Sequence, residues 1–284
     1  MPLGRGPFAF GLPSDFMDAA LFNRLSASVR AADPDRYFAT LFAPPQQRSH
    51  LLALYAFQAE VARVAETVRE PMLGAIRLEW WRETAEGAAR GHPRNHDVAR
   101  ALAELLAQRP VTLADLEALV AARAFDSAAD THAGFAELES YVDATSGAVM
   151  RIAAKILGGN PDHVREAGLA YGLTGLLRAL PFHNTRHKLY VPLDLLSALH
   201  VTPQEFFHLP RNDEKLAAAM RQLVLRARDH FLAARKGPKP GAALAAILPA
   251  ALVPVYLRKL NAPRDVPIHR RQMALLSAFV KKRL

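Results

Sequence analysis

The sequence predicts an all-α fold, arranged as a single-domain helical bundle over residues 1–284. Alanine and leucine dominate a composition that is 51% hydrophobic and only 8% aromatic, and this balance favours helices over strands. Apolar residues recur at helical spacing in several long segments. Proline and glycine fall between these segments as stop signals, and no convincing strand pattern lies among them.

The helices expected in the first half of the chain begin and end at such signals. The first runs from Arg48 to Arg69, and Pro71 opens the next, because proline is tolerated in a first helical turn. A stop at residues 91–93 ends that second helix. Asp97–Gln108 and Thr112–Arg123 follow, the latter with a capping pattern at its start. The apolar stripe of the first helix consists of Leu51, Leu54, Tyr55, Val61, Ala65 and Val68.

The second half of the chain continues the pattern. A long helix is expected over Phe135–Leu157, and the run Gly-Gly-Asn-Pro at 158–161 ends it. The next helix, Asp162–Leu180, should stop at Pro181, with a polar, basic connection over 182–192. Further helices are expected at Pro192–Ala198, at Thr202–Phe207, at Asp213–Lys236 and, as two final helices, after residue 241.

Composition excludes several classes of function. The chain has no cysteine, so disulfides, thiolate metal sites and cysteine nucleophiles are excluded. The net charge is +9, and a basic protein can bind nucleic acid, anionic lipid or a phosphorylated ligand. The basic residues are dispersed and do not interleave with aromatic ones, so we expect no nucleic-acid partner. The small cluster Lys281–Arg283 favours an anionic membrane surface.

The chain is expected to act in the cytoplasm, either free or peripherally at the inner membrane, and on the matrix side if the source is eukaryotic. Residues 1–13 are expected to be a flexible segment, and they show no secretory signal or evident mitochondrial presequence. The longest apolar run, Ala242–Leu257, is interrupted by Pro249 and Pro254 and is too short to span a membrane comfortably. It is therefore expected to be a buried core helix or a membrane-surface element.

Three segments together resemble the squalene/phytoene synthase family. The first is Tyr55–Glu66, in the place of the family's first aspartate-rich helix. The second is Tyr141–Leu157, a long core helix with Gly147 where the family has a glycine. The third is Leu173–Ala179 with the later Lys188–Pro192, which is similar to the second aspartate-rich helix and its following Tyr-x-Pro. The resemblance implies an isoprenoid synthase fold with a central cavity.

In the family, two Asp-x-x-x-Asp pairs hold magnesium ions, which neutralise the diphosphates. The first pair corresponds here to Ala62 and Glu66, and the second to Ala179 and His183. Three of the four carboxylates are therefore absent. Because Pro181 lies between the second two positions, we expect His183 not to follow Ala179 on one helix. No catalytic residue, metal site or cofactor is predicted. Magnesium would be a cofactor only if the protein were an active synthase.

One subfamily is more similar still, namely that of the mitochondrial assembly factor for respiratory complex I. The similarity rests on Glu60–Val64, Glu70–Gly74, Arg77–Arg82, Leu177–His183 and Arg186–Lys188. It implies an assembly role in place of catalysis, with complex I subunits or other assembly factors as partners. Two alternatives remain open: a head-to-head prenyltransferase that joins two prenyl diphosphates, and a protein that binds an isoprenoid or other lipid in the cavity.

The candidate site residues follow from this resemblance. The degenerate first motif places Gln58, Ala62 and Glu66 at the cavity, and the degenerate second motif places Arg178, Ala179 and His183 there. A possible anion-binding set comprises Arg36, Tyr37, Arg186 and Lys188.

Several of these residues have a simpler structural interpretation. A lone glutamate such as Glu66 is more often solvated or salt-bridged than a metal ligand. Arg178 either faces a phosphate or pairs with Glu66 across the former metal cage, and the sequence leaves both open. His183 and His187 have the spacing of metal ligands only within a helix, and a loop is expected there.

Overall fold

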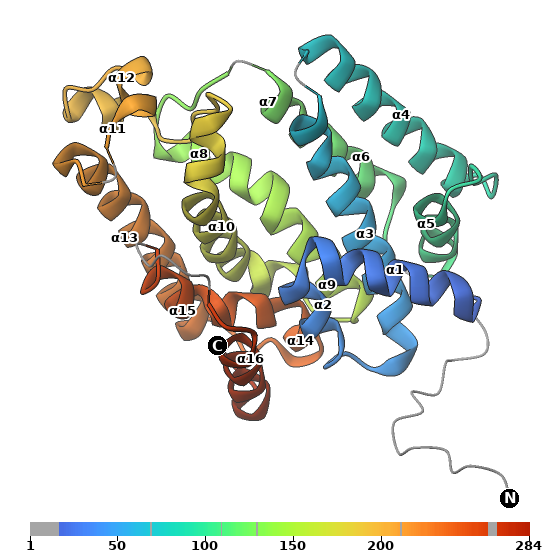
Figure 1. Ribbon diagram of the computed structural model, residues 1–284. Helices are drawn as coiled ribbons and strands as arrows, with labels where there is room; N and C mark the ends of the chain where they lie inside the picture. Colours follow the sequence, from blue (N-terminus) through green and yellow to red (C-terminus); the bar gives the residue numbers. More distant parts are fainter. Residues whose placement is uncertain (1–16, 69, 109, 129, 211, 261–265) are drawn as a thin grey trace, which may run out of the picture.

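The computed structural model describes residues 17–284, except 69, 109, 129, 211 and 261–265. Those residues form helices and no strand, so the all-α prediction is confirmed (Figure 1). The expected flexible segment 1–13 lies outside the described residues. No helix among the described residues has both the length and the apolar character needed to cross a membrane.

The helices cover most of the described chain. In the first half they are α1 Ala19–Ala32, α2 Pro34–Thr40, α3 Pro45–Thr67, α4 Pro71–Ala89, α5 Asp97–Gln108, α6 Leu113–Ala122, α7 Ala124–Ser127 and α8 Phe135–Val142. In the second half they are α9 Ala148–Ile156, α10 Arg165–Thr185, α11 Leu193–Ala198, α12 Pro203–His208, α13 Glu214–Lys236, α14 Leu244–Ile247, α15 Val253–Leu257 and α16 Ile268–Lys281. Short 3₁₀ turns precede α10, α14 and α15.

Local sequence signals set many of these boundaries. Pro45 and Pro71 stand in the first turns of α3 and α4, where a missing N–H costs nothing. The expected cap of α6 is present as a capping box between Thr112 and Asp115. The two tryptophans of α4 divide as helical geometry requires, since Trp81 is buried and Trp80 is partly exposed.

The long helix expected over 135–157 is interrupted by a π-helical turn. Residues Asp143–Gly147 form this turn between α8 and α9. The adjacent Gly168 of α10 approaches so closely that a Cβ atom there would lie 2.7 Å from the Cα atom of Gly147. The close packing of α10 on this turn therefore explains the glycine at 168. A Cβ atom at Gly147 would instead meet the side chain of Asp143, 2.7 Å from its Oδ1 atom.

The predicted stop at Pro181 is wrong, because α10 continues to Thr185. Pro181 is exposed in the last turns of the helix, where its missing N–H removes only one bond. Just beyond the cap residue Arg186, His187 has a φ of +52°, a left-handed conformation that ends the helix. The backbone N–H of Lys188 then donates to the carbonyl of His183 at 3.0 Å, which completes a Schellman-type cap. The start of the expected connection at 182–192 is thus helical.

The apolar run at 242–257 forms α14, α15 and the short 3₁₀ turns beside them, rather than one helix. Most of its side chains are buried, including Leu248, Leu252 and Tyr256. The alternative of a membrane-surface element in this run is therefore wrong. It closes the bundle on the side of α2 and α16, while α10 packs against α13 and the π-helical turn (Figure 1).

Candidate functional site

A large cavity lies between α3 and α10, with a volume of about 1070 Å³. Helix α3 contributes Ala62 and Glu66 to its wall, and α10 contributes Leu176, Phe182 and His183. The remaining wall comes from the α6–α7 region, from α8, from α12 and from the segment that follows α10. The two helices that carry the degenerate motifs therefore share one cavity.

A smaller pocket of about 250 Å³ adjoins it, and His183 lines both. Gln58 of α3 and Arg178 and Ala179 of α10 line this smaller pocket, together with Arg36 of α2. All six residues of the two degenerate motifs are thus brought to the paired cavities. The expectation that His183 would leave the helix of Ala179 is wrong, since both lie on α10, one turn apart.

The polar floor of the larger cavity centres on Asp126. Its carboxylate accepts hydrogen bonds from the hydroxyl groups of Tyr141 and Tyr190, at 2.6 and 2.7 Å. The guanidinium of Arg123 donates to the other carboxylate oxygen at 3.0 Å. The Asp126 side chain is only 7% exposed, so these three donors compensate the cost of burying its charge. Burial also raises the pKa of both tyrosines, which therefore stay protonated donors.

His183 carries a polar atom into this region without a hydrogen-bond partner among the described residues. Its Nδ1 atom is buried, and its ring lies 4.6 Å from that of Tyr190, measured between centroids. Burial lowers the pKa of His183 to about 4, although the nearby charge of Asp126 opposes the shift. The imidazole is therefore neutral near pH 7, and it cannot replace the negative charge of an aspartate.

The proposed anion-binding residues are divided among three places. Arg36 lines the smaller pocket, where it donates to Asp33 at 2.9 Å and lies over the ring of Tyr171. Arg186 and Lys188 line the larger cavity. The Lys188 ammonium donates to the backbone carbonyls of residues 125 and 128, at 2.6 and 2.7 Å, and burial lowers its pKa. Tyr37 instead packs against the core and under Arg30.

Arg178 lines the smaller pocket and contacts Tyr256 of α15. Its guanidinium lies 3.7 Å from the ring centroid of Tyr256, in a cation–π contact. Tyr256 in turn donates to Asp35, which also accepts from Arg271 at 2.9 Å. Arg178 is therefore held at the pocket by α15 and lies close to a buried carboxylate.

The described residues hold no group of three or more histidine or acidic side chains arranged to bind a metal ion. His183 and His187 do not form a helical pair, because α10 ends between them. Sequence reasoning missed Asp126 and Arg123. The only local signal was their spacing of three residues, since the partners Tyr141 and Tyr190 lie far away in sequence.

Comparison with known proteins agrees with this geometry. The family model of squalene/phytoene synthase matches residues 29–278. The chain belongs to the squalene/phytoene synthase family. A dehydrosqualene synthase whose crystal structure holds a ligand superposes with a TM-score of 0.77, at 15% identity, covering 92% of this chain and 97% of that one. At that identity the likeness establishes the isoprenoid synthase fold.

Two curated relatives of this chain have names that point to different functions. Complex I assembly factor 6 of Homo sapiens is 29% identical over 239 residues, which cover 82% of this chain and 72% of the relative. The 15-cis-phytoene synthase of Synechocystis is 26% identical over 217 residues, which cover 71% of this chain and 64% of the relative.

Proposed function

We propose that this protein is a non-catalytic member of the squalene/phytoene synthase family that acts in the assembly of respiratory complex I. Its partners would be complex I subunits or other assembly factors. The observation that carries the proposal is the state of the two motifs. Ala62, Ala179 and His183 occupy three of the four positions at which the family places carboxylates. The similarity to complex I assembly factor 6 supports the second half of the proposal.

The loss of charge, rather than a loss of geometry, argues against catalysis. Ala179 and His183 still lie one turn apart on α10 and line the cavities. Magnesium prefers carboxylate oxygens, and Glu66 alone supplies one at these positions. Removal of a single group that stabilises developing charge costs about 10²–10³ in rate, so the loss of three should abolish turnover.

The catalytic half is tested with farnesyl and geranylgeranyl diphosphate in the presence of magnesium. We expect no conversion by the purified protein, while a phytoene synthase assayed alongside serves as the positive control. Robust formation of squalene or phytoene would overturn the proposal and support the head-to-head prenyltransferase instead.

The assembly half is tested by gene deletion in the native host. We expect less assembled complex I on native gels, and restoration by the wild-type gene. The variant Glu66→Gln removes the last motif carboxylate and should restore assembly equally well. A deletion strain with normal complex I but altered carotenoids or hopanoids would contradict the proposal.

The retained cavity favours a second candidate, the binding of an isoprenoid or other lipid without chemistry. Its volume of about 1070 Å³ exceeds most sites for small molecules. Native mass spectrometry of the purified protein should then show a bound lipid. Leu176 lines both cavities, so Leu176→Trp should fill the space and displace the lipid. An unliganded wild-type protein would count against this candidate.

A further inference from the structure

Helix α16 exposes an apolar face that the bundle does not cover. Its inner face packs into the core through Leu275 and Ala278. On another face, Met273, Leu276 and Val280 follow one another at spacings of three and four residues, so their side chains share one side of the helix. Met273 is 63% exposed and Val280 is 70% exposed. Such an uncovered apolar face usually marks a contact surface.

The loop between α2 and α3 extends this surface. Phe42 packs against Phe279 of α16, with 4.8 Å between their ring centroids. Its neighbour Leu41 is exposed. The guanidinium of Arg48 on α3 donates to the carbonyls of Leu41 and Ala43, which holds the loop to α3. We call the set Leu41, Phe42, Met273, Leu276, Phe279 and Val280 the α16 patch.

The charged side chains of α16 and its flanking residues have one sign. Residues 266–284 contain no aspartate or glutamate and five lysine and arginine residues. Arg271 is held inward by Asp35, whereas Arg270 and the cluster Lys281–Arg283 are exposed. An apolar face bordered by basic residues is the pattern of helices that lie in a membrane interface.

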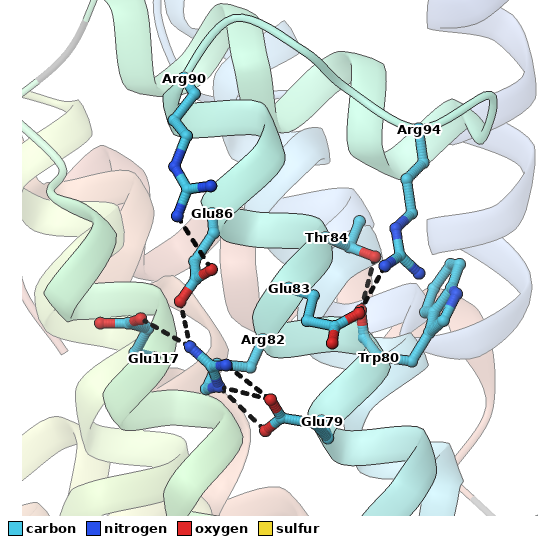
Figure 2. A network of polar contacts seen from close by, with 9 residues as sticks. All are labelled: Glu79, Trp80, Arg82, Glu83, Thr84, Glu86, Arg90, Arg94 and Glu117. Carbon is cyan, nitrogen blue, oxygen red and sulfur yellow. Dashed lines mark hydrogen bonds and ion pairs between the residues drawn. The ribbon is translucent and has the colours of Figure 1, made fainter.

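Helix α4 offers an internal comparison, because it also exposes apolar residues. Met72, Leu73, Ile76 and Trp80 are exposed on it. Figure 2 shows carboxylates on the same helix near Trp80, among them Glu79 paired with Arg82 and Glu83 paired with Arg94. Helices α4 and α16 lie at opposite ends of the molecule (Figure 1). The mixed charges of α4 do not favour an anionic surface, whereas those of α16 do.

We infer that the α16 patch docks the protein on an anionic phospholipid membrane, with its apolar side chains inserted among the lipids and its basic residues at the headgroups. The docking surface is independent of the assembly role and of what the cavity holds. A protein partner with an acidic rim is the competing occupant, and the experiments below separate the two.

Co-sedimentation with vesicles tests the charge requirement. The full chain should bind vesicles of phosphatidylcholine and phosphatidylglycerol, bind phosphatidylcholine alone far less, and dissociate as salt rises. The triple variant Lys281→Gln, Lys282→Gln, Arg283→Gln should lose about 100-fold in affinity, since each basic residue contributes about fivefold near such a surface. Absence of binding at low salt, or an unchanged affinity of the triple variant, would overturn the inference.

Site-directed labelling tests the apolar requirement and the orientation. The chain has no cysteine, so Val280→Cys can carry a single environment-sensitive dye, and Ile76→Cys on α4 is the matched control. The dye at 280 should shift to the blue on anionic vesicles, and the dye at 76 should not. Met273→Ser with Val280→Ser should weaken binding about tenfold or more, whereas Ile76→Ser should not.

Unchanged thermal unfolding of the serine variants would establish that they remain folded. A shift at 76 alone, or at neither position despite binding, would overturn the proposed orientation. Vesicle binding that is unchanged by both sets of substitutions on α16 would overturn the inference, and the α16 patch would then be assigned to a protein partner.

Discussion

Two sets of positions in this protein, the four motif positions and two buried aspartates, differ in the carboxylates they carry. At the four motif positions on α3 and α10, only Glu66 remains. Asp126 and Asp35 are instead buried, and each accepts hydrogen bonds from tyrosine and arginine donors. The first group would stabilise only a bound metal, whereas the second stabilises the fold itself. The difference indicates that loss of the metal motif leaves the bundle intact, because its buried polar groups are satisfied independently.

The largest expected effect is at Asp126. The substitution Asp126→Ala leaves two tyrosine hydroxyls and the Arg123 guanidinium without their acceptor, and the arginine becomes an uncompensated buried charge. We expect a loss of about 3–5 kcal/mol in the free energy of unfolding, measured by urea denaturation. The exposed Asp130 lines the same cavity, and Asp130→Ala should cost less than about 0.5 kcal/mol. Equal effects of the two substitutions would refute the division into two groups.

A smaller loss is expected when the other buried carboxylate, Asp35, loses a donor. Arg271→Met removes the charged donor of Asp35. Burial already raises the pKa of Asp35, so the carboxyl can take up a proton and part of the cost is avoided. We expect about 1.5–3 kcal/mol, the range for a hydrogen bond to a charged group. The exposed neighbour is the control, and a comparable loss for Arg270→Met would show that helix packing, not Asp35, is responsible.

The sequence predicted this fold well because helical periodicity and local stop signals are short-range properties. Pro71 and Thr112 begin their helices as expected, whereas α3 begins at Pro45, three residues before the expected start at Arg48. The end of α10 was not predictable in this way, since the left-handed residue is His187 rather than a glycine.

The polar floor of the cavity was less accessible to sequence reasoning. Asp126 meets Tyr190 across 64 residues, and no spacing rule connects such positions. Likewise, the sequence of α16 shows an amphipathic helix, but only its packing reveals which part of the apolar face the bundle leaves uncovered. The motif positions themselves were found through resemblance, and the structure places them at the paired cavities.

A pH titration tests His183, which occupies a motif position and lies near the buried Asp126. His183 has its pKa lowered by burial, from 6.5 to about 4, so the unfolded chain binds a proton more readily than the folded one. Stability is therefore full above pH 6.5 and falls as the pH decreases towards 4. Because the ring is partly exposed, we expect this loss to be about 1–2 kcal/mol.

Comparison of variants isolates the contribution of His183. The variant His183→Asn should show a flatter decline in melting temperature over this pH range than the wild type. The exposed His92 is the matched control, and His92→Asn should follow the wild-type curve. A wild-type slope in His183→Asn would assign the acid sensitivity to other groups.

The smallest effect expected is a gain, and it tests the motif positions directly. The triple variant Ala62→Asp, Ala179→Asp, His183→Asp adds three carboxylates at the paired cavities, one on α3 beside the native Glu66 and two on α10. Because α10 is helical through 183, the two new aspartates on it lie one turn apart and can share an ion. Magnesium at about ten times its dissociation constant should then stabilise the variant by about 1.4 kcal/mol, a rise of roughly 2–4 °C in melting temperature. The isosteric asparagine triple variant should show no such rise, since it lacks the charge, and the wild type should behave like it. A magnesium-dependent rise in the wild type would mean that Glu66 and the remaining polar groups still hold a metal. The contrast between the motif positions and the buried aspartates would then fail.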